Sequence, residues 1–148
     1  MSASNPAAAN IAAVESGGTK FRAAIYSGEI AAAAEAPAPL AELRIDTTTP
    51  DETLHAIGDF LAEHEAATLG IASFGPLIVD RSSENYGSVA PTPKPGWTGA
   101  PILSVLRDRL GVTADIQTDV EAAAVAEQQF GAGRGHDGVA YVLSLIHI

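Results

Sequence analysis

The stretch Ile11-Ala-Ala-Val-Glu-Ser-Gly-Gly-Thr-Lys20 places a pair of glycines between two apolar runs near the start of the chain. Residues 11–15 predict a first strand. Residues 20–27 alternate apolar and polar side chains with a period of two, which is typical of a second strand. Gly17 and Gly18 between these runs predict a tight turn. The fold is therefore expected to begin with an antiparallel hairpin.

The same turn is a candidate for binding an anion. Glycines at a hairpin let backbone N–H groups approach a phosphate without a Cβ in the way. Thr19 adds a hydroxyl and Lys20 a positive charge. An ordinary Gly-Gly hairpin explains these residues equally well. The Gly-x4-Gly-Lys spacing of a Walker A loop is absent.

Beyond the hairpin, helices and strands are expected to alternate. A third strand is predicted at residues 29–36, although its alanines fit a helix equally well. A helix is predicted to begin at Thr49-Pro50-Asp51-Glu52, which combines an N-cap hydroxyl with proline at the first helical position. Further elements are a strand at 68–73, a loop over 75–97, a helix at 101–110, a strand at 114–118, a helix at 120–130 and a strand beginning at 139–143. This order predicts an α/β domain with a mixed sheet flanked by helices.

Composition limits the classes of protein that are possible. The 148 residues suffice for one domain, and 47% hydrophobic with 18% charged residues is typical of a folded chain. A net charge of −10 disfavours nucleic acid as a partner. The absence of cysteine excludes disulfides and cysteine-based zinc sites in these residues. Residues 1–10 predict a flexible tail without a secretory signal, and no apolar run approaches the ~20 residues of a membrane span. These features predict a cytoplasmic location.

Asp119 is the candidate for acid–base chemistry. In Gln117-Thr118-Asp119-Val120-Glu121 it stands where a predicted strand ends and a helix begins. Ligands in α/β folds bind at this edge, and the positive end of a helix favours an ionised carboxylate. The alternative is an aspartate that only caps the helix, and the local sequence by itself favours that role. The Gly-x-Gly-x-x-Gly pattern at 133–138 follows a helix, the reverse of a dinucleotide-binding turn, and predicts a loop.

Taken together, these segments resemble the ROK sugar kinases of the actin-like ATPase superfamily at four places in order. Residues 11–20 resemble the first phosphate loop of that family, with Glu15 at the acidic position linked to the metal ion. Gly70-Ile-Ala-Ser-Phe-Gly-Pro76 resembles its sugar-side loop. Tyr86-Gly87 followed by Thr92-Pro-Lys-Pro-Gly-Trp97 is similar to the bacterial fructokinase branch. Thr118-Asp-Val-Glu-Ala-Ala-Ala124 is similar to the segment whose aspartate is the catalytic base.

The resemblance implies an actin-like ATPase (ribonuclease H-like) N-terminal domain over residues 11–143. It implies ATP and Mg²⁺ as cofactors, and phosphorylation of a hexose, for this branch D-fructose to fructose 6-phosphate. Asp119 would be the base. Gly17, Gly18, Thr19 and Lys20 would face the phosphates, and Glu15 would reach Mg²⁺ through water, so that no residue ligates the metal directly. The sugar-side candidates are Ser73, Gly75, Thr92, Lys94 and Thr118. Trp97 is either part of this site or a packing anchor for its loop.

The sequence also departs from the family. Thr118 and Glu121 stand where the family more usually has asparagines. A second phosphate loop is expected after the strand at 139–143, but the chain reads Ser144-Leu-Ile-His-Ile148. Residues 144–148 are therefore expected to be a non-native tail at a truncation, and the fragment is expected to be inactive alone. The second phosphate loop and a structural zinc site are expected only in the missing C-terminal half.

Other functions remain open. Within the same family the alternatives are a glucokinase or an N-acetyl-amino-sugar kinase, and the segment Thr92 to Trp97 favours fructose. A ROK transcriptional regulator would carry a helix-turn-helix, for which the ten residues before the first strand are too few. A non-catalytic actin-like module would not need Asp119 opposite a phosphate loop. The partners expected are the sugar and ATP, without nucleic acid or membrane, and the full-length protein is expected to form a homodimer.

Overall fold

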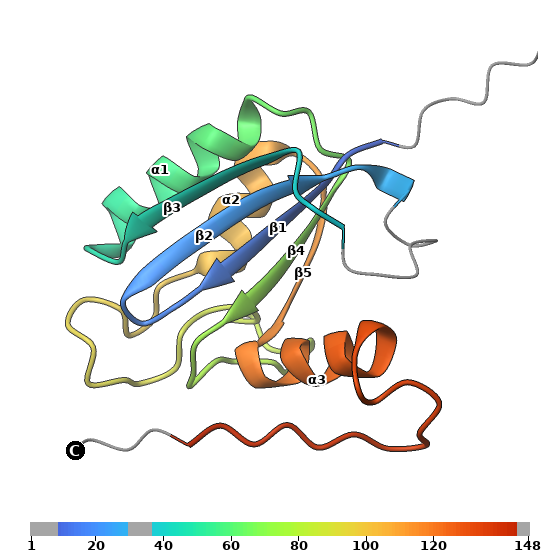
Figure 1. The fold of residues 1–148 in the computed structure, drawn as a ribbon. Coiled ribbons are helices and arrows are strands. Elements are labelled where there is room, and N and C mark those ends of the chain that lie inside the picture. Colours follow the sequence, from blue (N-terminus) through green and yellow to red (C-terminus); the bar gives the residue numbers. More distant parts are fainter. Residues whose placement is uncertain (1–8, 30–36, 145–148) are drawn as a thin grey trace, which may run out of the picture.

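One mixed five-stranded sheet organises the chain. The computed structural model describes residues 9–29 and 37–144. The strands are β1 (Ile11–Ser16), β2 (Lys20–Tyr26), β3 (Ala41–Asp46), β4 (Thr68–Ser73) and β5 (Thr113–Thr118). They lie in the order β3-β2-β1-β4-β5 (Figure 1). The pairs β1–β2 and β2–β3 are antiparallel, whereas β1–β4 and β4–β5 are parallel, which confirms the predicted mixed sheet.

Three helices accompany the sheet. They are α1 (Pro50–Ala62), α2 (Ile102–Leu110) and α3 (Asp119–Phe130). The first two contact each other and pack on the same side of the sheet, α1 over β2 and β3 and α2 beside β5. By contrast, α3 leaves the end of β5 and contacts β4 and β5 (Figure 1). Within the described ranges, none of these helices has the length and apolar character needed to cross a bilayer.

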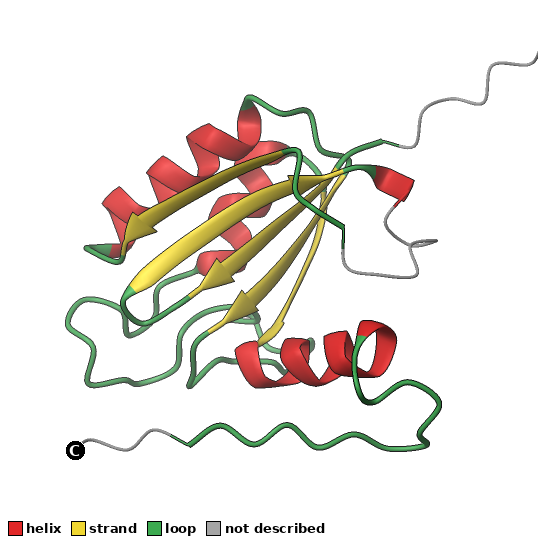
Figure 2. Ribbon diagram, in the orientation of Figure 1, coloured by secondary structure: helices red, strands yellow, loops and turns green. Residues whose placement is uncertain are grey.

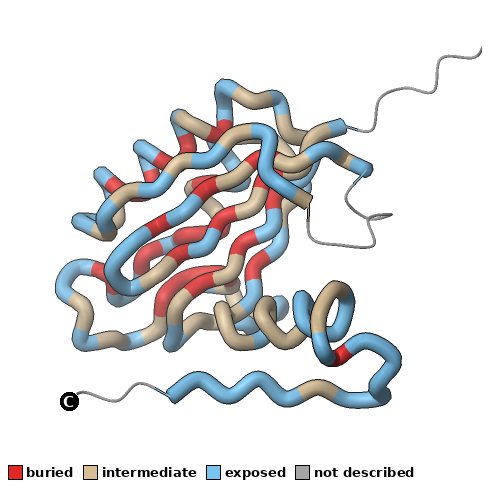
Figure 3. Tube along the Cα trace, in the orientation of Figure 1, coloured by how far each residue is buried: buried red, intermediate tan, exposed pale blue. Residues whose placement is uncertain are grey.

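The core lies between the sheet and the pair α1–α2. Alternate residues of the strands point toward these helices, and the burial pattern follows this alternation along β1, β2 and β4 (Figure 3). The largest fully buried side chains are Trp97, Phe21, Ile25, Ile57, Leu61, Ile102, Leu106 and Ile116. Burying a side chain of this size contributes about 1.5–3 kcal/mol, so this single cluster is the main source of stability.

The start of α1 follows its sequence signal. Thr49 is the N-cap, and its hydroxyl accepts a hydrogen bond from the backbone N–H of Glu52 at 3.3 Å. Pro50 occupies the first helical position, where its missing N–H costs nothing. The inward face then carries Leu54, Ile57 and Leu61, as the helical spacing predicts.

Two predicted strands differ from the structure. The strand predicted at 29–36 lies outside the described residues, apart from its first position, and the third strand is instead β3 at Ala41–Asp46. Residues 139–143 form a loop (Figure 2), so the strand predicted there is wrong. A strand needs a neighbour for its backbone hydrogen bonds, and within the described chain this segment pairs with none. Residues 133–138 form the predicted loop after α3.

Candidate active site

Three parallel strands end side by side at one edge of the sheet. Ser16 of β1 is in register with Ser73 of β4, and Ser73 is in register with Thr118 of β5. Because neighbouring strands lie ~4.8 Å apart, the backbones of Ser16 and Thr118 are about 10 Å apart. The glycine hairpin follows the first of these residues and Asp119 follows the last. The two halves of the predicted site therefore emerge at the same sheet edge.

The hairpin at this edge is tight and held from one side. The N–H of Gly17 donates to the carbonyl of Lys20 at 2.9 Å. A Cβ on Gly17 would stand 2.5 Å from that carbonyl oxygen, so a glycine is required here. The hydroxyl of Thr47 donates to the Gly17 carbonyl at 2.8 Å, and the Thr47 N–H donates to the Thr19 carbonyl at 2.9 Å. The residue after β3 thus fixes the hairpin.

Lys20 is engaged with the neighbouring strand. Its ammonium forms an ion pair with Asp46, the residue opposite it in the β2–β3 register. The hydrogen bond and the charge of Lys20 lower the pKa of the Asp46 carboxyl. Both groups are largely exposed, so the pair adds little stability. Lys20, which was expected to face phosphates, therefore pairs with a residue of the neighbouring strand β3 in this structure.

Asp119 is the first residue of α3, and it is not the cap of that helix. The N-cap is Thr118, whose hydroxyl accepts the Glu121 N–H at 3.3 Å, while the Glu121 carboxylate accepts the Thr118 N–H at 3.3 Å. This reciprocal arrangement is a capping box. Oδ1 of Asp119 accepts only the N–H of Val120, at 2.9 Å. Within the described chain Oδ2 has no bonding partner and stays available.

Glu15 and Asp119 line a common groove of about 620 Å³. The groove lies between α3 and the sheet face that α1 and α2 leave open, and small residues such as Ala72 and Ala122 form part of its wall. Glu15 lies 3.7 Å from the guanidinium of Arg22. The hairpin and the segment 91–97 do not line this groove, so the structure brings Glu15 to Asp119 but leaves the phosphate and sugar candidates beyond it.

The sugar-side candidates occupy different environments. Ser73 is fully buried, and its hydroxyl lies 3.3 Å from that of Ser16 and donates to the Phe74 carbonyl at 3.1 Å. The hydroxyl of Thr118 belongs to the capping box. Gly75 is exposed in the loop after β4, and Thr92 is half-buried. The sugar contacts of all four stay predictions.

The segment 91–97 is fixed by Trp97. This side chain is fully buried, and its Nε1 donates to the Thr48 carbonyl at 2.9 Å. Its ring centroid lies 5.4 Å from that of Phe21 and 5.5 Å from that of Phe74. Trp97 is therefore the packing anchor of its loop. It ties that loop to β2, to the end of β4 and to the segment before α1.

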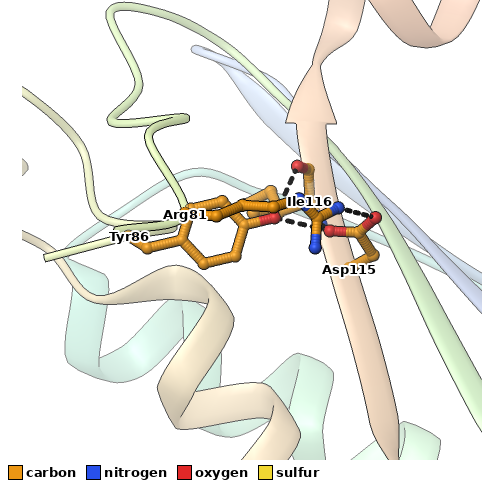
Figure 4. A network of polar contacts seen from close by, with 4 residues as sticks. All are labelled: Arg81, Tyr86, Asp115 and Ile116. Carbon is orange, nitrogen blue, oxygen red and sulfur yellow. Dashed lines mark hydrogen bonds and ion pairs between the residues drawn. The ribbon is translucent and has the colours of Figure 1, made fainter. Parts of the chain in front are cut away.

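A polar network on β5 was not predicted. Tyr86 and Arg81, both in the loop after β4, converge on the carboxylate of Asp115 (Figure 4). The hydrogen bond from Tyr86 lowers the pKa of the Asp115 carboxyl despite its partial burial, and Arg81 adds to this effect. Burial first, and then the Asp115 carboxylate, raise the pKa of the Tyr86 hydroxyl. No local pattern in the sequence signals this contact.

Comparison with known proteins places this geometry in a family. The family profile described as the ROK family matches residues 11–144. The chain is 37% identical over 135 residues to a fructokinase from Zymomonas mobilis, a match that covers 87% of this chain and 42% of the relative. It is 36% identical over 121 residues to a fructokinase from Pediococcus pentosaceus, covering 82% and 40%.

A solved structure of the same family has a similar fold. A ROK family glucokinase from Streptomyces griseus, in complex with glucose and AMPPNP, superposes with a TM-score of 0.66 at 26% identity. That match covers 86% of this chain and 39% of the other. The chain thus has the actin-like ATPase fold of this solved ROK family structure. The chain belongs to the ROK family, and it spans about two fifths of the length of the curated relatives it matches.

Proposed function

We propose that this chain forms part of an ATP-dependent hexose kinase whose substrate is D-fructose. The observation that carries the proposal is the register of β1, β4 and β5, which brings the glycine hairpin and Asp119 to one sheet edge. A separation of about 10 Å between the two strand ends leaves room for a phosphoryl group and a sugar hydroxyl between them. Phosphoryl transfer depends mainly on such positioning and on charge stabilisation.

Asp119 would act as the general base. Its Oδ2 is available, and it lies in the first turn of α3, directly after the sheet edge where β1, β4 and β5 end. An ionised carboxylate there can orient the 6-hydroxyl of fructose and accept its proton during transfer. A positioned base of this kind contributes typically 10²–10⁴-fold in rate, as an order of magnitude.

The phosphates would bind at the hairpin of Gly17, Gly18, Thr19 and Lys20. The backbone N–H groups of Gly18 and Thr19 make no hydrogen bond to any described residue, so they can donate to phosphate oxygens. Ser73, Gly75, Thr92, Lys94 and Thr118 are proposed for the sugar side.

The residues present fit a magnesium ion that arrives with the nucleotide. Glu15 and Asp119 line one groove, and the described residues contain no cluster of three or more potential ligands. Mg²⁺ usually keeps several waters and takes only one or two carboxylates, so a complete protein cage is not needed. When bound, the ion would neutralise phosphate charge, with Glu15 holding it through water.

Fructose is favoured over glucose by the relatives. The two fructokinases are 36–37% identical to this chain, whereas the glucokinase of known structure is 26% identical. A glucokinase or amino-sugar kinase is the alternative. The proposal includes a cytoplasmic location, a homodimer of the full-length protein and small molecules as partners. The net charge of −10 supports it by disfavouring nucleic acid.

The test is a coupled assay of ADP release by the full-length protein with fructose, glucose, mannose and N-acetylmannosamine. We expect the highest kcat/KM with fructose and a loss of turnover in Asp119→Asn. The matched control is Asp137→Asn, which removes an exposed carboxylate in the loop after α3. Near-normal turnover of Asp119→Asn contradicts the assignment of the base. A higher kcat/KM with glucose than with fructose contradicts the proposed substrate and favours the alternative, a glucokinase.

A further inference from the structure

The carbonyl groups of the hairpin are held by donors from two distant segments. Thr47 donates to the carbonyls of Gly17 and Thr19, as described above. The carbonyl between them, that of Gly18, accepts a hydrogen bond from Nζ of Lys94 at 2.5 Å. Three successive carbonyls are thus fixed by protein donors.

Because the peptide group is planar, these hydrogen bonds to the carbonyls also determine the direction of the neighbouring N–H groups. In a trans peptide, the carbonyl of one residue and the N–H of the next point in opposite directions. Among the described residues only Gly75–Pro76 is cis, so both hairpin peptides are trans. The bond from Lys94 to the Gly18 carbonyl therefore turns the Thr19 N–H away from Lys94. A Cβ on Gly18 would meet no atom within 4 Å, so the hairpin has open space at that point.

Lys94 is suited to this task by its surroundings. Its ammonium lies 6.0 Å from the ring centroid of the buried Trp97, which fixes the segment that carries it. It forms no ion pair with any acidic group in the part of the chain that the structure describes. Lys20, in contrast, is paired with Asp46. Of the two lysines near the hairpin, only Lys94 holds its backbone.

We propose that Lys94 is a positioning residue that locks the Gly18–Thr19 peptide in the orientation that presents the Thr19 N–H to a polyphosphate. Gly18 places little restriction on its own side of this peptide, so a donor from outside the hairpin helps to hold one orientation. With the peptide inverted, a carbonyl oxygen would face the anion and repel it. This inference rests on the proposed function only in taking the hairpin as the phosphate site.

The test uses the 148-residue chain labelled with ¹⁵N and titrated with inorganic tripolyphosphate. The amide shifts of Gly18 and Thr19 report binding at the hairpin. Lys94→Met and Arg107→Met each remove one positive charge, the second from an exposed side chain on α2 outside the proposed site, so the net charge changes equally in the two variants. We expect Lys94→Met to weaken binding about tenfold and to lose the Thr19 shift, because a charge-assisted hydrogen bond no longer orders the peptide. Arg107→Met should stay within about twofold of the wild type, and Lys94→Arg should restore binding.

Each outcome either supports or overturns the proposed role of Lys94. Equal weakening in Arg107→Met and Lys94→Met shows a general charge effect and overturns the inference, as does wild-type affinity in Lys94→Met. In both cases the proposed function stands. No hairpin shift in the wild type removes the phosphate site itself, and with it both proposals. The shifts of strand amides verify folding, and Lys94→Gln provides the second test if the methionine variant does not fold.

Discussion

The hydroxyl of Tyr86 donates to Oδ1 of Asp115 at 2.5 Å and fastens the long loop after β4 to the edge strand β5. Oδ2 of the same carboxylate accepts a hydrogen bond from Arg81 at 2.5 Å, and the Arg81 guanidinium lies 5.4 Å from the Tyr86 ring centroid. The loop thereby covers part of an edge strand that would otherwise expose unpaired backbone groups. It also steadies the strand that leads into Asp119.

Removal of the Tyr86 hydroxyl should weaken this attachment. We expect Tyr86→Phe to lower the free energy of unfolding by about 1 kcal/mol, the usual net contribution of one hydrogen bond. Urea unfolding followed by circular dichroism measures it. Tyr141→Phe, at an exposed tyrosine, is the control and should leave the free energy unchanged. Equal stability of the two variants contradicts a stabilising role for the contact.

The same contact should make stability depend on pH in two ranges. The folded pKa of Asp115 lies below its ordinary 3.8, so its contribution is present above that value and is lost as the pH falls through the folded pKa. The folded pKa of Tyr86 lies above 10.0, so its contribution is present below that value and is lost as the pH rises further. Asp115 is half exposed, which limits its effect to less than about 1 kcal/mol.

The measurement is the difference in unfolding free energy between wild type and Tyr86→Phe across the pH range. It should be constant from about pH 5 to pH 9 and shrink on either side. A difference that does not change between neutral and acid pH contradicts the assigned pKa direction of Asp115.

Substitutions of Thr118 and Asp119 should affect different properties, the first the free energy of unfolding and the second kcat. Thr118→Ala breaks the capping box and should cost about 1 kcal/mol of stability. Asp119→Asn leaves that box intact and should cost about 0.5 kcal/mol or less. In the full-length protein, however, Asp119→Asn should reduce kcat about 10²–10⁴-fold. Urea unfolding and the ADP-release assay together test the pair, and a large loss of stability in Asp119→Asn would show a structural role instead.

Trp97 should be essential to the stability of its loop. Trp97→Phe removes the donor to the Thr48 carbonyl and leaves space beside Phe21, so we expect a loss of about 2–3 kcal/mol. Circular dichroism during urea unfolding measures it. Trp97 is the sole tryptophan of the chain and is fully buried, so wild-type fluorescence should also shift to longer wavelength on unfolding. An unchanged emission maximum contradicts its burial.

The elements with strong local signals could be predicted from the sequence. Thr49 and Pro50 marked the start of α1, and β4 was predicted with its observed bounds because turn residues enclose a short apolar run. β3 was missed although Ala41, Leu43 and Ile45 alternate with charged residues. The alanine-rich run before it, at residues 29–36, was predicted as the third strand instead. The segment 139–143 has strand-like composition, but composition supplies no pairing partner.

In the candidate site, too, features set by neighbouring residues could be predicted, whereas contacts between distant residues could not. The junction of strand and helix placed Asp119 at the sheet edge, because local residue types decide that junction. The contact between Lys94 and Gly18, and that between Tyr86 and Asp115, join residues that are far apart in the chain. Their charges were visible in the sequence, but the approach of one loop to another depends on packing around Trp97. The pairing of Lys20 with Asp46 depended on a strand that the sequence did not place.

The alignment of Ser16, Ser73 and Thr118 has a consequence for how the site comes into being. The hairpin leaves the ribosome early, but Asp119 follows β5 as the first residue of α3 and arrives much later. Contacts between such distant segments form late, since the intervening loops must close first. A nascent chain interrupted before β5 therefore contains the hairpin without Asp119, so the two parts of the proposed site come together only after β5 and the start of α3 have been made.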